Sequence, residues 1–435
     1  MVLKRVHPNW LINRMNFSKA ISLKTRATVP QKNLVGEKSE LHTSRPSTNY
    51  QVCKASAVST SGPAVHRGRM TSLDAFRGLT IALMILVNSP GDTGTVYAPL
   101  SHVNWNGWTF ADAVFPSFLF IVGVSIVLSF GKREEIPSSN TLYMFRVLRR
   151  TIILFALGLF VNGFPSFYLP AIRIPGVLQR IAICYFVASM IVLNAGLRGR
   201  IMWLIGLLAS YWLMILFIPV PGIGAGVLEP GQNFAAWVDL RLLKGHMWSY
   251  YDGQWDPEGI VSTIPAIATT IFGVLTGQLL KSSLPARKKA AWMVCAGVVL
   301  LTAGLILSRW LPINKSLWTS TFSIFMAGMA LVCFAFFQWM IDVENLSSWA
   351  KPLIILGLNP ITVYVLSIVL DSTLRSTNMA LSTGNGASCP FYLFGILCVP
   401  IAKPEVASLL YAFSILIIMF LIAWFMWRRR VFIKI

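Results

Sequence analysis

Charged side chains are scarce in this chain. Of 435 residues, 12% are Asp, Glu, Lys or Arg, whereas 55% are hydrophobic. A soluble domain carries about 25% charged residues, so this chain has too little charge to cover a surface that faces water. The scarcity excludes most soluble architectures and indicates a polytopic membrane protein.

Acidic residues are scarcer than basic ones. The chain has 16 Asp and Glu against 37 Lys and Arg, which gives a net charge of +21. Such an excess is also typical of nucleic-acid-binding proteins, but its placement does not fit one. Residues 1–70 hold twelve Lys and Arg against Glu37 and Glu40, which is +10, and +11 is left for the rest. No single basic face follows, and we expect no nucleic-acid partner.

Paired cysteines are also missing. The six cysteines show no repeated spacing and three of them lie in apolar runs, which favours small buried hydrophobic residues over disulfides or metal ligands. A bridge between Cys389 and Cys398 is the alternative, since both fall in one non-cytoplasmic stretch. We expect no metal site.

Apolar runs of about 20 residues recur after residue 70, each long enough for a helix to cross a bilayer core of ~30 Å. They predict an all-α polytopic bundle of about ten spans, near 73–90, 109–130, 149–166, 177–196, 201–219, 260–280, 289–308, 317–340, 352–372 and 406–427. A shorter apolar piece at 391–402, broken by Pro400, indicates a re-entrant or interfacial segment. No convincing internal repeat is found.

Lys and Arg in the short connections predict the orientation. With both termini cytoplasmic, the inner connections and the tail contain Lys132, Arg133, Arg146, Arg149, Arg150, Arg198, Arg200, Lys281, Arg287, Lys288, Lys289, Lys351 and Arg428, Arg429 and Arg430. The outer connections are poorer in these residues over more sequence. Much of the positive charge is therefore a signal of membrane topology.

The first 70 residues are polar, basic and free of any run that could span a bilayer. We expect a domain division into a disordered or cleaved basic tail or targeting segment at 1–70 and a membrane domain at 71–435. The composition of the tail resembles an organellar transit segment. A basic cytoplasmic tail held near anionic lipid is the alternative.

Histidine, a side chain suited to acid–base chemistry, is rare in the expected membrane domain, which contains only His102 and His246. His102 lies in the short connection between the first two expected spans. Its imidazole could exchange a proton near neutral pH or accept an acyl group. The alternative is an interfacial histidine in a belt with Trp105 and Trp108.

Two further polar residues flank His102. Asn88, at the outer end of the first span, could hold a substrate carbonyl or developing oxyanion, or simply cap the helix. Asp112 opens the second span, where a carboxylate needs a partner such as His102, whose tautomer it could fix. A role at the positive end of the helix dipole is the alternative for Asp112.

Basic residues at the cytoplasmic end could meet a phosphate-bearing donor. Arg77 lies three residues after Asp74, with which it can pair, and Arg149 and Arg150 belong to the same face in the predicted topology. The positive-inside bias explains each of these arginines equally well.

Two outer segments combine opposite charges. Arg173 and Arg180 carry guanidiniums into the start of a span, which requires anionic partners. Trp255, Asp256 and Glu258 open the sixth span with an aromatic and two acids, a combination suited to binding a sugar with a carboxylate beside an amine. A plain acid cluster at a helix start is the alternative.

Taken in order, seven short motifs resemble the heparan-alpha-glucosaminide N-acetyltransferase family of transmembrane acetyltransferases. They cover roughly 71–435 and read SLDAFRG at 72–78, His102 with WNG at 105–107, DAVFP at 112–116, RIPGVLQR at 173–180, DPEG at 256–259, PINKSLW at 312–318 and GLNP at 357–360. Each motif alone is weak, but the ordered set is specific.

The resemblance implies acetyl transfer from cytosolic acetyl-CoA, the co-substrate, across the membrane to the amine of a terminal glucosamine or similar amino sugar. It implies that His102 is the active-site histidine and that Asn88 assists it, either through an acetyl-histidine intermediate or by direct transfer. Lysosomal animal members carry a luminal domain and a span ahead of this region, and we expect this chain to have neither. We expect a lysosome- or vacuole-like endomembrane, with a plastid or mitochondrial membrane as the alternative, and a homodimer is compatible with the family.

Two other classes of protein compete with an enzyme. In a transporter or permease, the same intramembrane charges would line a pathway. In a lipid-anchored scaffold, function would depend on residues 1–70.

Overall fold

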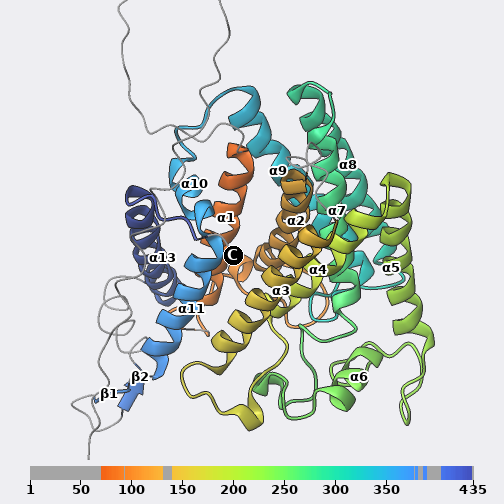
Figure 1. Ribbon diagram of the computed structural model, residues 1–435. Helices are drawn as coiled ribbons and strands as arrows, with labels where there is room; N and C mark the ends of the chain where they lie inside the picture. The colour runs from red at the N-terminus through yellow and green to blue at the C-terminus, as the bar shows by residue number, and fades with distance from the viewer. Residues whose placement is uncertain are drawn as a thin grey trace, which may run out of the picture. The chain divides into compact units, whose positions relative to one another are not determined.

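The computed structural model describes residues 70–92, 94–130, 140–376, 378–380, 386–388 and 403–433. All of these lie in one compact unit, Val65–Ile435. The helices, labelled in Figure 1, are α1 Thr71–Asn88, α2 Phe110–Phe130, α3 Asn140–Gly163, α4 Val177–Asn194, α5 Leu197–Phe217, α6 Phe234–Leu242, α7 Thr263–Lys281, α8 Ala286–Leu307, α9 Ser320–Gln338, α10 Lys351–Leu358, α11 Pro360–Ser376 and α13 Pro404–Arg428. This confirms the all-α polytopic bundle.

Eight helices in the described ranges are long and apolar enough to cross a membrane, and a bent pair raises the number to nine. The chain is therefore a multi-pass membrane protein. The eight are α1, α2, α4, α5, α7, α8, α9 (extended through a π-helical turn, Trp339–Val343) and α13. Each overlaps a span expected from the sequence.

The other two expected spans differ from simple apolar helices. α3 covers the span expected at 149–166 but begins earlier, and every 18-residue stretch of it contains Arg146, Arg149 and Arg150, so it is not among the eight. The span expected at 352–372 is the pair α10 and α11, bent by 83°. The bend falls at Asn359, because a residue before proline is disfavoured in the α conformation.

Two helix pairs pack in backbone contact. A Cβ atom added at Gly123 of α2 would lie 1.9 Å from the carbonyl oxygen of Thr270 in α7, and one at Gly273 would lie 2.0 Å from that of Phe120. α1 meets α10 in the same way through Gly78 and Gly357. Glycine is needed at these four positions because no side chain fits between the helices.

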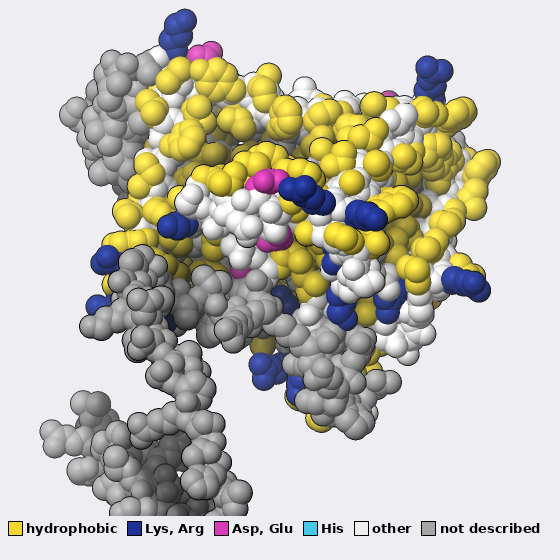
Figure 2. Space-filling model, turned by 90° about the horizontal axis from the view of Figure 1, so that it is seen from above, with side chains coloured by type: hydrophobic (Ala, Val, Ile, Leu, Met, Phe, Trp, Pro, Cys, Tyr) yellow, Lys and Arg dark blue, Asp and Glu magenta, His cyan; other side chains and the backbone are white. Residues whose placement is uncertain are grey.

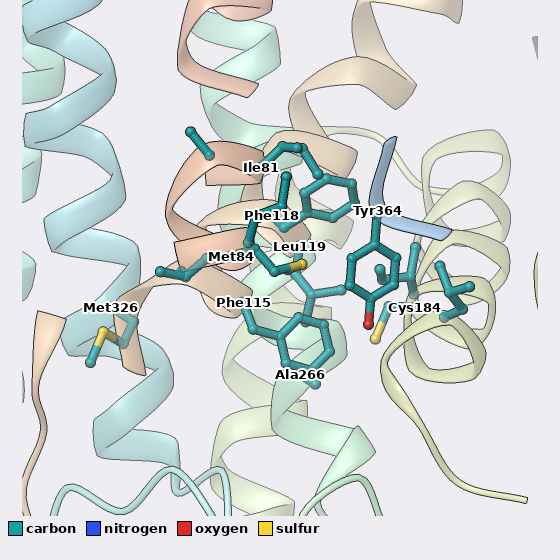
Figure 3. Close-up of a cluster of buried hydrophobic side chains, with 14 of the residues drawn as sticks. Ile81, Met84, Phe115, Phe118, Leu119, Cys184, Ala266, Met326 and Tyr364 are labelled. Atoms are coloured by element: carbon teal, nitrogen blue, oxygen red, sulfur yellow. The ribbon is translucent and has the colours of Figure 1, made fainter. Parts of the chain in front are cut away.

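A large cluster of buried side chains fills the centre of the bundle. Figure 3 shows part of it, where α1, α2, α4, α7, α9 and α11 contribute Ile81, Phe118, Cys184, Ala266, Met326 and Tyr364. About 78% of the α2 and α7 spans is buried, against 17% of α5 and 22% of α8. The exposed sides of α5 and α8 are apolar, which suits helices that face lipid.

The polar loops gather at one end of the bundle. Figure 1 shows α6 among them, at the end opposite the start of α1. The same loops contain three short 3₁₀ turns, Ala98–Leu100, Leu169–Ala171 and Ser249–Tyr251. A small antiparallel hairpin of β1 (Asn378–Ala380) and β2 (Gly386–Ser388) follows α11. Neither α6 nor the hairpin was expected, because both are too short to produce a clear pattern.

Several expectations lie outside the described residues. These are the disordered or cleaved tail, the interfacial segment at 391–402 and the Cys389–Cys398 bridge. Among the described cysteines, Cys184 is buried, as expected of a small hydrophobic residue, whereas Cys295 is exposed on α8.

Candidate functional site at the loop end of the bundle

The first cluster of the candidate site forms where α2 begins. Asp112 lies in the first turn of α2 and its side chain is completely buried. Its Oδ2 accepts hydrogen bonds from the backbone N–H and the hydroxyl of Thr109, both at 3.0 Å. These bonds give the polar groups of Thr109 a partner at the start of the helix and hold the carboxylate in place. Oδ1 is left to face the loop.

His102 meets that free oxygen. Its Nδ1 lies 2.8 Å from Oδ1 of Asp112, which is the partner expected from the sequence. Because a carboxylate only accepts hydrogen bonds, Nδ1 donates in this pair when it carries the ring proton, and Nε2 then keeps its lone pair. The His102 side chain is 46% exposed, so a substrate can reach the ring.

Lys315 completes this cluster from the loop between α8 and α9. Its Nζ lies 3.1 Å from Oδ1 of Asp112, 2.9 Å from Nδ1 of His102 and 3.3 Å from Nε2. Burial lowers the pKa of Lys315, against the opposing effect of Asp112 and Glu258. Sequence reasoning missed Lys315 as a site residue, although it lies inside the motif PINKSLW.

Hydrogen bonds beside the cluster join the loop before α2 to the loop between α8 and α9. The backbone N–H of Gly107 donates to the carbonyl of Ile313 at 2.8 Å, and the side chain of Asn314 donates to that of Asn106 at 3.1 Å. Gly107 has φ of +109°, a conformation in which a side chain would be strained. These contacts hold His102 and Lys315 against each other.

The second cluster joins the loops before α4 and α7. Arg173 donates to both oxygens of Asp256, from Nε at 2.8 Å and from Nη2 at 2.6 Å, and also to Glu258. Burial would lower the pKa of Arg173, but the charges of Glu258 and Asp256 raise it above its usual value. The guanidinium also lies over the ring of Trp248, 4.7 Å from its centroid.

Arg180 is buried just inside this cluster, with 1% of its surface exposed. Its Nη2 donates to the carbonyl of Pro257 at 2.9 Å and to the hydroxyl of Ser262 at 2.5 Å. Nε and Nη1 find no hydrogen-bond partner among the described residues. The sequence requirement for anionic partners is thus met by Arg173, whereas Arg180 binds neutral oxygens.

Aromatic rings connect the two clusters. Trp105, three residues after His102, meets Trp255 edge to face with 5.0 Å between ring centroids, and Tyr251 stacks on Trp255 at 3.8 Å. Trp255 is only 7% exposed, whereas Tyr250 is 75% exposed and Trp248 38%. Trp255 therefore supports the loop, and Trp248 and Tyr250 present the accessible ring surface.

The remaining candidate residues are not in these clusters. Asn88 is exposed at the last turn of α1, and in the described part of the chain it makes no hydrogen bond to His102. Its assisting role stays a prediction. No group of three potential metal ligands occurs within the described ranges.

The three arginines predicted to contact the donor lie on α1 and α3. Arg77 pairs with Asp74 at 3.0 Å, as the spacing predicts, and donates to the hydroxyl of Ser125 at 2.8 Å. The guanidinium of Arg150 lies 4.7 Å from the ring centroid of Tyr185, and Arg149 is exposed. Their role in binding the donor stays a prediction.

Comparison with known proteins agrees with the motifs. Residues 69–282 match the family described as heparan-alpha-glucosaminide N-acetyltransferase, catalytic. This range contains both clusters except Lys315, which lies C-terminal to it.

Two curated relatives carry the name heparan-alpha-glucosaminide N-acetyltransferase. The mouse protein is 31% identical, over 70% of this chain and 54% of its own length, and the human protein is 30% identical, over 68% and 52%. The chain thus spans about half the length of the relatives it matches. On these matches and on the ordered motifs around His102, Arg173 and Asp256, the chain belongs to the heparan-alpha-glucosaminide N-acetyltransferase family.

Proposed function

We propose that this protein is a membrane-bound acyltransferase. It moves the acetyl group of cytosolic acetyl-CoA to the amine of a terminal glucosamine, or of a similar amino sugar, on the other side of the membrane. Family membership supports the reaction type. The observation that carries the proposal is the His102–Asp112 pair, which holds a half-exposed imidazole through Nδ1, so that the carboxylate does not engage Nε2.

His102 supplies the proton chemistry in this proposal. The acceptor enters as an ammonium and must lose a proton before its nitrogen can attack the thioester. In direct transfer, Nε2 takes the proton of the ammonium, and the free amine attacks the thioester carbonyl. The S–C bond breaks, and the second proton that the amine nitrogen loses goes to the sulfur, so CoA leaves as the thiol. In the covalent route, Nε2 attacks the thioester carbonyl and CoA leaves as the thiolate; the free amine then attacks the acetyl group, the bond from Nε2 to the acetyl carbon breaks, and the proton lost by the amine nitrogen goes to water. Asp112 holds the ring in the required tautomer in both cases.

The second cluster is the acceptor site in this proposal. Glu258 and Asp256 attract the ammonium of the amino sugar, and Arg173 orients both carboxylates. Trp248 and Tyr250 offer ring faces against which a pyranose can pack. Arg180 has two buried nitrogen atoms, Nε and Nη1, without hydrogen-bond partners among the described residues, and their N–H groups suit a hydroxyl or carbonyl oxygen of a substrate.

The donor approaches from the opposite end of the bundle in this proposal. Arg77, Arg149 and Arg150 contact the phosphates of acetyl-CoA, and Asn88 holds the thioester carbonyl beside His102. Figure 2, which views the end at which α1 begins, shows Lys and Arg side chains spread over a mainly hydrophobic surface. Such scattered cations fit a cytoplasmic membrane face.

The proposed location is the bilayer of an endomembrane compartment, lysosome- or vacuole-like, with both termini in the cytoplasm. An even number of crossings is needed for that arrangement. The eight helices together with α3 and the bent pair α10–α11 provide ten.

The test is acetyl transfer by the purified protein in detergent. Acetyl-CoA with a radiolabelled acetyl group is mixed with glucosamine, and labelled N-acetylglucosamine is separated and counted. We expect turnover by the natural protein and a loss of at least about 100-fold for His102→Ala.

His42→Ala is the matched control, because it removes a histidine from the N-terminal tail. Its rate should equal that of the natural protein. Full activity of His102→Ala would refute the role of His102, and no transfer by any form of the protein would refute the proposed function.

A further inference from the structure

We propose that Lys315 is a positioning residue that keeps His102 neutral, by placing an ammonium against the imidazole and the Asp112 carboxylate together. The inference rests on the proposed function in so far as His102 is the reacting group. The contacts that support it are those of Nζ, 2.9 Å from Nδ1 of His102 and 3.1 Å from Oδ1 of Asp112.

The charges in the cluster explain the effect. A histidine paired with a carboxylate alone is favoured as imidazolium, because the opposite charge stabilises the protonated ring. Here the ammonium already neutralises Asp112, so a proton on His102 would leave a net charge of +1 beside a fully buried carboxylate. Lys315 therefore removes most of the reason for the ring to bind that proton.

Few other titratable groups act on this cluster. Three described titratable groups act on Lys315. His102 of the loop before α2 and Asp112 of α2 are in contact with it, and Glu258 of the loop before α7 acts from a greater distance. Glu258 is paired with Arg173, which offsets its charge. The remaining polar neighbours, Asn106 and Asn314, are neutral.

The position of Lys315 is set by its backbone. Asn314, just before it, accepts a hydrogen bond from the N–H of Leu317 at 2.8 Å and holds Asn106 with its amide. Trp318, three residues after it, is 1% exposed and packs edge to face on Phe115 of α2. These contacts fix the backbone on both sides of Lys315, and its side chain is held at its end by Asp112 and His102.

The test measures how readily His102 accepts an electrophile as pH changes. Diethyl pyrocarbonate reacts with the unprotonated imidazole, and mass spectrometry of peptides reports His102 and His246 separately in one digest. The full chain in detergent is treated between pH 5 and pH 8, as the natural protein, as Lys315→Met and as Lys315→Arg. Methionine keeps most of the length of the side chain and removes the charge, whereas arginine keeps the charge.

We expect the midpoint of His102 modification to rise by about one pH unit or more in Lys315→Met. Below that midpoint its modification then slows by about tenfold relative to the natural protein. Lys315→Arg should retain the natural midpoint. His246, whose Nδ1 lies 2.9 Å from the carbonyl of Ile172, is the internal control, and its modification should be the same in all three proteins.

An unchanged His102 midpoint in Lys315→Met would overturn the proposal. So would an equal rise in Lys315→Met and Lys315→Arg, because that result would assign the effect to altered packing and not to charge. The measurement needs no acetyl transfer, so its outcome is separate from that of the acetyltransferase assay.

Discussion

Asp112 links the local structure of α2 to the chemistry of His102. One of its oxygens is used by Thr109 at the helix start, and the other is shared by His102 and Lys315. The same side chain thus begins a helix and orients an imidazole. The structure contains the contacts behind both explanations that the sequence left open for Asp112, because the carboxylate has two oxygens.

Asp112→Asn tests the orienting role. Asparagine has the same shape, but its amide presents a donor or a weaker acceptor to Nδ1, so the ring loses its fixed tautomer. We expect acetyl transfer to fall by about 10²- to 10⁴-fold, measured as kcat with glucosamine. Asp371→Asn, which removes a surface pair with Arg375, is the control. Equal effects of both substitutions would contradict the role.

Asp239 gives a dependence of stability on pH. Burial raises the pKa of this carboxyl to about 7, and the charge of Asp256 adds to the effect. In the unfolded chain its pKa is about 3.9. Between about pH 4 and pH 7 the folded protein therefore holds a proton that the unfolded chain has lost, so the stabilisation is complete below pH 4 and is lost as pH rises through 7.

We expect thermal unfolding in detergent at a higher temperature at pH 5 than at pH 8, and a weaker pH dependence in Asp239→Asn. Each unit of pKa shift is worth about 1.4 kcal/mol, so the change amounts to a few kcal/mol at most. Asp252→Asn is the control, because Asp252 is exposed in a left-handed conformation that asparagine also adopts. A steep dependence retained in Asp239→Asn would exclude this carboxyl as its source.

Lys315 shows what sequence reasoning misses at the residue scale. Its immediate neighbours in the sequence, Asn314 and Ser316, carry no charge, and the connections expected on the same side contain other Lys and Arg. Lys315 is 213 positions from His102 in the sequence, and only the fold shows that its Nζ lies 2.9 Å from the His102 ring. His102 and Asp112 could be predicted because they are close in sequence and because histidine is rare.

Among the elements, the spanning helices were predictable and their irregularities were not. Apolar runs locate α1, α2, α4, α5, α7, α8, α9 and α13, since lipid requires a continuous apolar helix. The break between α10 and α11 was not predicted, although Pro360 marks it. A proline inside an apolar run can kink a helix or divide it, and tertiary contacts decide between the two. Here the side chain of Asn359 accepts a hydrogen bond from the N–H of Ile433 at 2.9 Å and donates one to the carbonyl of Val431 at 3.1 Å.

The pair α2 and α7 depends on its glycines. Gly123→Ala places a methyl group 1.9 Å from the carbonyl oxygen of Thr270, so the two helices must separate. We expect a loss of about 1–3 kcal/mol in stability, seen as a lower thermal unfolding midpoint in detergent. Gly206→Ala on α5 has no neighbour within 4 Å and should leave the midpoint unchanged or slightly higher. Equal midpoints for both variants would show that α2 and α7 do not pack this closely.

For the whole molecule, the sequence indicated the membrane and the ordered motifs indicated the family. The net charge of +21 looked at first like a nucleic-acid signal, but +10 of it belongs to residues 1–70 and the rest is spread along the chain. The two clusters come from four separate loops, 89–109, 164–176, 218–262 and 308–319, and from the starts of α2 and α4. The topology expected from the sequence puts these loops on one side of the membrane, but their contacts follow only from how the helices pack.

The central claim is that acetyl groups cross the membrane through this protein to an acceptor beside His102. The direct measurement uses proteoliposomes with glucosamine trapped inside and labelled acetyl-CoA added outside. The proposal predicts that labelled N-acetylglucosamine accumulates inside vesicles that contain the natural protein, and not inside those that contain His102→Ala. Product that forms only when both substrates are on the same side, or equally with His102→Ala, would contradict it.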